Sequence, residues 1–373
     1  ICLPCTCVVL GDGSDVVPVI IETDSLFSLF SLFSFSFFFP VVHHSTHHIH
    51  ISSPPPHASS SSMITVGQYT DDSWALTFAL SDPTLDVVLI VASTNNTIGR
   101  ARIIAKLCEA AGRDDIPIAC GPVENEYVGP QGEWANDYDL SHYRGGVSTD
   151  PISLIANITR QQQAIGKIVY FLELSPPVIL TKVIEAHPGL MESTAFVSAM
   201  SGSISVCYHG TPGACSEYNA RFRVNATKAM YQSTFSNGFI MSPLDTSGLL
   251  IINGNSYQTL LNAEHTHPLL AAELDSMRVW KKYCPFDAFG LYCDEADPRI
   301  DTGVLYDLQA TALISLADDF ISPLVIEEVP IFADDEGNTK INTTGSQSPI
   351  LVAISWSNMS QFIQSLLTVL LSK

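Results

Sequence analysis

Two stretches decide the fold expected of this chain: VVPVIIETD at residues 16–24 and TDDSWALTFAL at residues 70–80. The apolar, β-branched run 16–21 predicts a buried strand that ends in an acidic turn. In the second stretch the large apolar residues fall on one face of a helix that starts at Asp71 and Asp72. A strand, an acidic turn and a helix are therefore expected, with carboxylates at the carboxyl end of the strand.

The same alternation continues along the rest of the chain. Further strands are expected at 87–92, 116–119, 169–174, 196–200, 324–331 and 350–355, and helices at 98–111, 181–186 and 361–371. Continuous apolar strands separated by helices predict an α/β fold, an open, mostly parallel central sheet flanked by helices in a Rossmann-like arrangement. We expect one domain over 1–373, with its ligand site beyond the carboxyl ends of the strands.

Composition excludes several classes of partner. Lys and Arg total 17 against 38 Asp and Glu, a net charge of −21. Such a chain repels nucleic-acid phosphates and anionic membrane surfaces, so neither is expected to bind. The nine cysteines are an odd number, and three crowd residues 2–7, so no disulfide framework is expected. Without a cationic leader the cytoplasm is the default compartment.

Residues 25–64 do not fit this organisation. The run from 25 to 70 has no charged side chain and repeats Phe, Ser, Leu and His. A membrane span is disfavoured because Ser interrupts the apolar part, and a His-rich metal tract remains an alternative. We interpret 25–64 as a low-complexity insertion of the kind that a translated, pyrimidine-rich intron end would give, and a smaller irregularity at 161–168 as having the same cause.

Removing the insertion joins the two opening stretches. Asp24, Asp71 and Asp72 then converge at the carboxyl end of the first strand, and three hard oxygen donors in one crevice favour Ca²⁺ or Mg²⁺. The simpler alternative is that Asp71 and Asp72 only stabilise the start of a helix.

The rejoined motif resembles the inosine–uridine-preferring nucleoside hydrolase family, in which Asp-x-Asp, a short loop and Asp-Asp precede an apolar helix. The resemblance continues in order through the chain, and we take it as that of a fungal-type member. The further matching pieces are Ala92 to Thr97, Ala111 to Pro117, Leu174 to Leu180, Met200-Ser201-Gly202, Ser216 to Asn219, Pro243-Leu244-Asp245 and Val304 to Asp307.

The resemblance implies a Ca²⁺-dependent hydrolase that cleaves the N-glycosidic bond of ribonucleosides. It implies that the metal ligands are Asp24, Asp72, Asp307 and the carbonyl of Val178, with Asp24 also the general base. The substrate would be held by Asp71, Asn96, Met200, Glu217 and Asn219. The partner is then a small-molecule nucleoside, and a homo-oligomer is possible.

Three departures from the family pattern keep alternatives open. Glu22 stands where the signature has Asp, and we assign it a supporting role. Ile179 replaces an Asn, and Tyr306 replaces the His that protonates the leaving base in some members, which leaves that role to His265 or His267. The alternatives are an inactive protein of this fold that binds ribose or a nucleoside, and a metal-dependent phosphatase with Asp-x-Asp after its first strand.

Overall fold

The computed structural model describes residues 16–23, 70–284, 296–344 and 348–372. Its centre is a nine-stranded sheet in the order β12-β15-β9-β6-β5-β1-β2-β3-β4, parallel throughout except for β12 at one edge. The strands are β1 (Val17–Thr23), β2 (Leu85–Ala92), β3 (Ile118–Cys120), β4 (Val147–Ser148), β5 (Val169–Leu174), β6 (Ala195–Met200), β9 (Phe239–Ser242), β12 (Leu324–Val329) and β15 (Ile350–Trp356).

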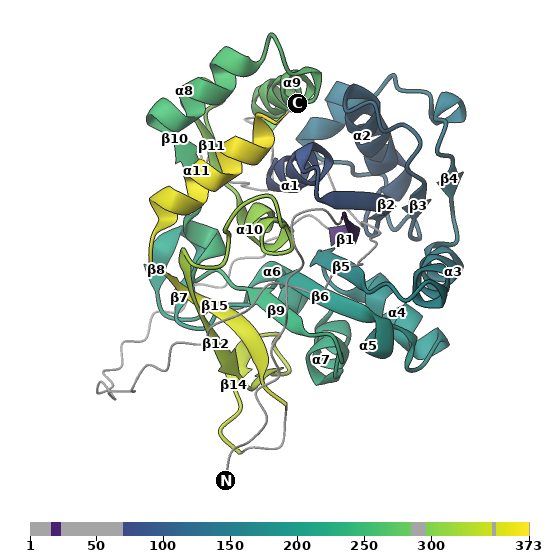
Figure 1. The fold of residues 1–373 in the computed structure, drawn as a ribbon, viewed down its shortest axis with the longest axis vertical. Coiled ribbons are helices and arrows are strands. Elements are labelled where there is room, and N and C mark those ends of the chain that lie inside the picture. Colours follow the sequence, from purple (N-terminus) through teal and green to yellow (C-terminus); the bar gives the residue numbers. More distant parts are fainter. Residues whose placement is uncertain (1–15, 24–69, 285–295, 345–347, 373) are drawn as a thin grey trace.

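Helices cover both faces of this sheet (Figure 1). On one face lie α1 (Asp71–Ser81), α2 (Thr97–Ala110), α9 (Pro268–Tyr283), α10 (Tyr306–Ala312) and α11 (Met359–Leu370), with α8 (Gly254–Ala263) beyond them. On the other lie α3 (Pro151–Ala164), α4 (Val178–Ala186), α5 (Leu190–Thr194) and α7 (Val224–Gln232), with α6 (Tyr218–Phe222) preceding α7. The predicted α/β class with a mostly parallel sheet is confirmed.

Three short two-stranded antiparallel pairs lie outside the sheet. They are β7 (Val206–Cys207) with β8 (Thr211–Pro212), β10 (Ile251–Asn253) with β11 (Asp301–Val304), and β13 (Ile331–Ala333) with β14 (Thr339–Ile341). The strand expected over 324–331 is split, because Pro330 has no backbone N–H to continue the ladder and the chain turns there into β13.

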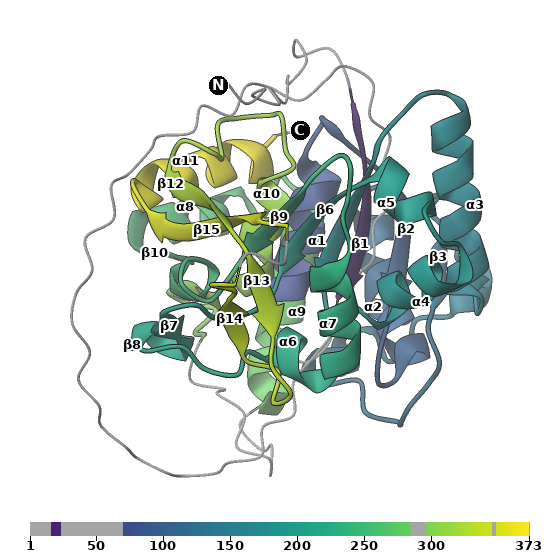
Figure 2. The same ribbon diagram turned by 90° about the horizontal axis from the view of Figure 1, so that it is seen from below.

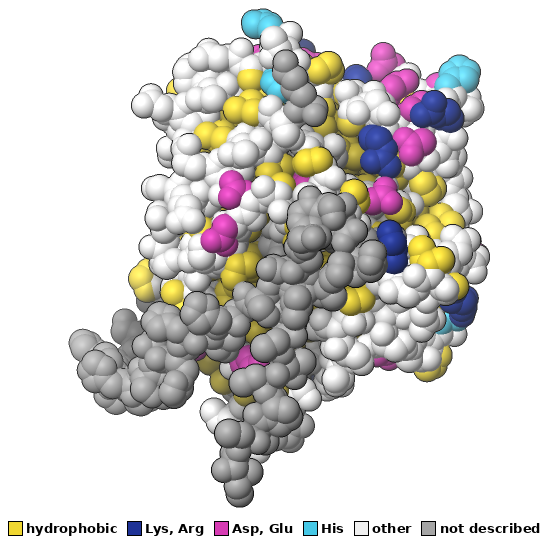
Figure 3. Space-filling view, in the orientation of Figure 1, with side chains coloured by type: hydrophobic (Ala, Val, Ile, Leu, Met, Phe, Trp, Pro, Cys, Tyr) yellow, Lys and Arg dark blue, Asp and Glu magenta, His cyan; other side chains and the backbone are white. Residues whose placement is uncertain are grey.

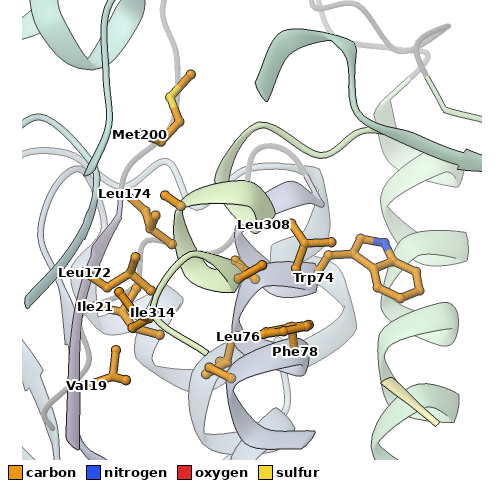
Figure 4. Close-up of a cluster of buried hydrophobic side chains, with 14 of the residues drawn as sticks. Val19, Ile21, Trp74, Leu76, Phe78, Leu172, Leu174, Met200, Leu308 and Ile314 are labelled. Carbon is orange, nitrogen blue, oxygen red and sulfur yellow. The ribbon is translucent and has the colours of Figure 1, made fainter. Parts of the chain in front are cut away.

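Strand β1 lies near the middle of the sheet, between β2 and β5 (Figure 2). Val19, Ile20 and Ile21 of this strand are fully buried. So are the large apolar side chains of α1, Trp74, Leu76 and Phe78. Figure 4 shows Ile21 of β1 and Leu174 of β5 on one side of α10, and Leu308 of α10 beside Trp74 of α1 on the other. This core fixes α1 and α10 side by side over the central strands.

Two expectations were wrong. Residues 161–164, read as an irregularity, form the last turn of α3, which begins with an Asp150 N-cap and Pro151. Disulfides are present: Cys207 is bonded to Cys215, and Cys284 is also disulfide-bonded. The first bond was missed because the two cysteines are brought together by the turn of the β7–β8 hairpin, which carries no clear sequence pattern.

Within the described ranges, no helix combines the length and the apolar character that a membrane crossing requires. On the face seen in Figure 3, Lys and Arg side chains are interleaved with Asp and Glu. That face therefore has no basic stretch along which nucleic-acid phosphates could run. The proposed insertion at 25–64 lies outside the described residues.

Candidate functional site

Three carboxylates meet at the carboxyl end of the central strands. Asp71 and Asp72 are the first two residues of α1, and Asp307 is the second residue of α10. One carboxylate oxygen of each lies within 4.8 Å of the other two, and all three side chains are buried. The packing of α1 against α10 thus brings together residues more than 200 positions apart, as the resemblance implied for Asp72 and Asp307.

The cluster carries more negative charge than its surroundings neutralise. Burial raises the pKa of Asp71 from 3.8 to about 7. Burial, reinforced by the charges of Asp307 and Asp71, raises the pKa of Asp72 well above its usual value, and the Arg100 guanidinium opposes that rise. Burial and Asp71 also raise the pKa of Asp307. In the absence of a further cation, burial and mutual repulsion both favour the neutral form of these carboxyls.

The donor chemistry fits a hard divalent cation. Among the described residues, Oδ1 of Asp71 and Oδ1 of Asp72 are buried and have no hydrogen-bond partner. Unpartnered buried carboxylate oxygens are costly, and a bound Ca²⁺ would satisfy them. The cluster includes Asp71, which the resemblance assigned to the substrate. Asp24, the expected metal ligand and general base, lies outside the described residues.

Val178, the predicted carbonyl ligand, is the first residue of α4, directly after the loop that follows β5. Its carbonyl oxygen accepts a hydrogen bond of 3.2 Å from the Thr181 hydroxyl.

Glu22 connects β1 to α4. Its two carboxylate oxygens accept hydrogen bonds of 3.0 Å from the backbone N–H groups of Ile179 and Leu180, and its side chain is fully buried. Both bonds use N–H groups that the first turn of a helix leaves unpaired. Glu22 therefore fixes the residues that follow Val178 relative to the strand that leads to Asp24.

Glu173 is an acidic neighbour of Glu22 that the sequence reasoning missed. It is the register partner of Glu22 across β5 and β1, and it is also fully buried. Burial raises the pKa of Glu22 to about 7, and burial with the Glu22 charge raises that of Glu173 well above its usual value. No motif indicated this pair, which exists only because the two strands are adjacent.

The predicted substrate residues Met200 and Asn219 lie together at the end of β6. The Asn219 side-chain amide donates to the carbonyl oxygens of Leu174 at 3.2 Å and of Met200 at 3.1 Å. Its Oδ1 takes no part in these bonds. Asn219 thus joins the ends of β5 and β6 while its acceptor oxygen stays available.

Glu217 and Asn96 serve as helix caps. The Glu217 carboxylate accepts from the N–H groups of Asn219, Ala220 and Gly202 at 2.8–2.9 Å. Asn96 accepts from Gly99 N–H at 2.9 Å at the start of α2 and donates to the Glu126 carbonyl at 3.0 Å. In both residues the polar atoms are engaged by the chain itself.

A buried polar network holds the first turn of α1. The Ser73 hydroxyl donates to Glu273 of α9 at 2.7 Å and accepts from the Gln131 amide at 2.9 Å. Burial raises the pKa of Glu273 to about 8. These residues, and Arg100 of α2, were missed because each stands alone in the sequence without a recognisable spacing.

Tyr306 packs against an aromatic neighbour. Its ring lies 5.9 Å from that of Tyr208, edge to face, and the Tyr208 hydroxyl accepts from Tyr218 N–H at 2.9 Å. His265 is exposed, and His267 is the residue before α9.

The fold has clear neighbours among solved structures, whereas neither a protein-family model nor a curated protein sequence matches this chain. A plant nucleoside hydrolase superposes with a TM-score of 0.64 at 16% identity, covering 86% of this chain and 100% of its own. An inosine-guanosine nucleoside hydrolase gives 0.64 at 15%, covering 84% and 99%. A purine-preferring ribonucleoside hydrolase from Gardnerella vaginalis gives 0.60 at 13%, covering 84% and 98%. The chain therefore has the fold of these enzymes.

Proposed function

We propose that this chain is a nucleoside hydrolase that uses Ca²⁺ to cleave the N-glycosidic bond between ribose and a nucleobase. The observation that carries the proposal is the buried Asp71, Asp72 and Asp307 cluster at the carboxyl edge of a sheet shared with nucleoside hydrolases. Neither the carboxylate cluster nor the shared fold suffices alone, because acidic clusters occur without metals and one fold can host many activities.

Asp72 and Asp307 would hold the cation, together with Asp24 and the Val178 carbonyl, and Asp71 lies close enough to contribute. When bound, calcium would supply Lewis acidity toward a water and the ribose hydroxyls. In the hydrolysis a water oxygen bonds to the anomeric carbon, the carbon–nitrogen bond breaks, and the base leaves with a proton. Asp24 is the proposed acceptor of the proton lost by the water.

Asn219 is the best placed of the proposed ribose-binding residues. Its amide is held by two strand-end carbonyls, so its Oδ1 has a fixed position from which to accept a ribose hydroxyl. Glu217 and Asn96 would act mainly by holding α6 and α2, since their own polar atoms are already bonded.

The second candidate is a protein of this fold that binds a nucleoside without cleaving it. The packing of Tyr306 on Tyr208 favours it, because a phenol held as part of an aromatic wall replaces the His that would protonate a leaving base. A phosphatase would need a nucleophile at Glu22. Both Glu22 oxygens accept backbone hydrogen bonds in a fully buried site, which argues against that reaction.

We further propose that 25–64 is not part of the functional protein. A metal site built from Asp24 and α1 needs its ligands a few ångströms apart, and a short loop achieves this at lower entropic cost than a long one. The cytoplasm was the default expectation for the compartment.

The experiment is ribose release from inosine, uridine, adenosine and cytidine, with Ca²⁺ or with chelator, for the full chain and for a chain that lacks 25–64. Calcium-dependent release from either form supports the hydrolase. If calcium binds but neither form releases ribose, the protein is one that binds a nucleoside without cleaving it. Asp72→Asn should abolish release, while Asp82→Asn, at the other end of the same helix, should leave it intact.

A further inference from the structure

The cysteines of the described chain fall into two classes. Cys207 and Cys215 are joined across the β7–β8 hairpin, and Cys284 is also oxidised, whereas Cys108 in α2 and Cys120 in β3 are buried free thiols. Structural disulfides persist in oxidising compartments and are rare in the cytosol. The structure therefore points away from a reducing environment.

The sequence also contains five Asn-x-Ser/Thr acceptor sequences for N-linked glycans, at residues 95, 157, 225, 342 and 358. The side chains of Asn342 and Asn358 accept hydrogen bonds from the nearby N–H groups of Thr344 and Gln361. The other three differ in accessibility. Asn157 lies on the exposed face of α3 and Asn225 on that of α7. Both helices belong to the outer layer of the molecule (Figure 1). A glycan on either side chain would project into solvent.

Asn95 provides the contrast. Its side chain is only 5% exposed, it adopts φ +55°, and its Oδ1 accepts a hydrogen bond of 2.8 Å from the Asn125 amide. A glycan there would displace this packing next to the proposed ribose site. Folded protein is therefore expected to lack a glycan at Asn95.

We propose that the protein matures in an oxidising secretory compartment and carries N-linked glycans at Asn157 and Asn225. In glycosylation, the asparagine Nδ2 forms a bond to the anomeric carbon of a lipid-diphosphate-linked oligosaccharide. The bond from that carbon to the diphosphate breaks, and the amide loses one proton. In disulfide formation, the Cys207 and Cys215 thiols give two electrons and two protons to a protein disulfide donor, which becomes a dithiol.

This inference is independent of the hydrolase activity. It is also compatible with the burial of the threonine hydroxyls in the two acceptor sequences. Thr159 and Thr227 are fully buried, and the Thr227 hydroxyl donates to the Asn219 carbonyl at 3.3 Å. Glycans are added before folding completes, so the glycosylating enzyme recognises the threonine hydroxyl first and the hydroxyl becomes buried afterwards. For the same reason Asn→Gln variants are cleaner than Thr→Ala variants, which would disturb the core.

The test is peptide mapping of the protein purified from its own source. The sample is unfolded in denaturant and alkylated without reduction, so that buried free thiols react. It is then deglycosylated in heavy-oxygen water so that each glycosylated Asn becomes a labelled Asp. We expect labels at residues 157 and 225 and none at 95, with alkylation of Cys108 and Cys120 but not of Cys207 and Cys215.

The matched variants are made in a secreting eukaryotic host. N157Q and N225Q should each remove one glycan from the released, folded protein, and N95Q should remove none. Unlabelled Asn157 and Asn225 in the native protein, or alkylated Cys207 and Cys215, would overturn the proposal. A failure of ribose release would not affect it.

Discussion

Asp72→Asn should make the calcium-free protein more stable and at the same time abolish its response to calcium. The substitution keeps the shape of the side chain and removes one charge from a buried cluster. Ordinary loss of a buried contact destabilises a protein, so a gain in stability would be specific to relief of repulsion.

The magnitude follows from the geometry. The carboxylate oxygens lie within 4.8 Å of one another, and at that separation two charges repel each other by about 3.5 kcal/mol at an effective dielectric constant of 20. Asp72 faces both Asp71 and Asp307. Protonation of the carboxyls and the nearby Arg100 guanidinium reduce this repulsion energy. Raising the pKa of Asp71 from 3.8 to about 7 corresponds to a cost of about 4 kcal/mol at pH 8. We therefore expect a gain of about 2–4 kcal/mol in the free energy of unfolding at pH 8.

The pH dependence gives a second signature. A carboxyl whose pKa is raised in the folded state binds more protons there than in the unfolded chain between about pH 4 and 7. The stability of the calcium-free wild type should therefore fall as pH rises through that window. At pH 5, below the raised pKa of Asp71, protonation relieves the repulsion, and the advantage of Asp72→Asn should shrink to about 1 kcal/mol or less.

The assay is equilibrium denaturation at pH 5 and pH 8, in chelator and in excess Ca²⁺. Calcium at about 100 times its dissociation constant should stabilise the wild type by about 2.7 kcal/mol and Asp72→Asn not at all. Asp82→Asn is the control, since Asp82 is a buried acid at the other end of α1 whose carboxylate accepts from Thr84. Destabilisation of Asp72→Asn at pH 8 in chelator, or a full calcium response, would refute the reasoning.

Three further perturbations follow from the same structure. Glu22→Ala should lower the free energy of unfolding by about 1–3 kcal/mol, because it leaves two buried N–H groups at the start of α4 unpaired. It should also weaken calcium binding. Unchanged denaturation and calcium titration curves would contradict this prediction. Replacing Cys207 and Cys215 together by Ser should lower the free energy of unfolding by about 2.5 kcal/mol, which is the chain entropy of a loop with a separation of 8 residues. The melting temperature of this variant should no longer respond to reductant. The control variant Cys120→Ala should still respond. Deleting 25–64 should raise soluble yield or calcium affinity, and an unfolded product by circular dichroism would show that the segment belongs to the protein.

The sequence predicted the parts of the fold that depend on local pattern. The apolar runs at β1, β2 and β5 and the helical spacing of α1 are each visible over a few residues, and the structure has them within two or three residues of the expected bounds. Helix α3 was missed although Asp150 and Pro151 form a typical helix start, because its middle is polar and lacks a strong apolar stripe.

Parts of the site that depend on neighbours in space could not be predicted in the same way. Glu173 faces Glu22 only because β5 is placed beside β1, and Ser73 meets Glu273 only because α9 crosses α1. Arg100 is a single basic residue in a helix, and its position next to Asp72 follows from the packing of α2. Such contacts become visible only once the sheet order is known.

Unused hydrogen-bonding capacity separates the residues of the site that face a ligand from those that hold the fold. Glu217 has three backbone donors on its carboxylate, so a ligand that bound there would have to break existing bonds. Asp71 and Asp72 each have a buried oxygen with no partner among the described residues. Burial of an unpaired charge is tolerated in a native fold mainly where function requires it. The cost of that arrangement in the metal-free protein is the reason to expect that a cation completes it, and the denaturation series with Asp72→Asn measures that cost directly.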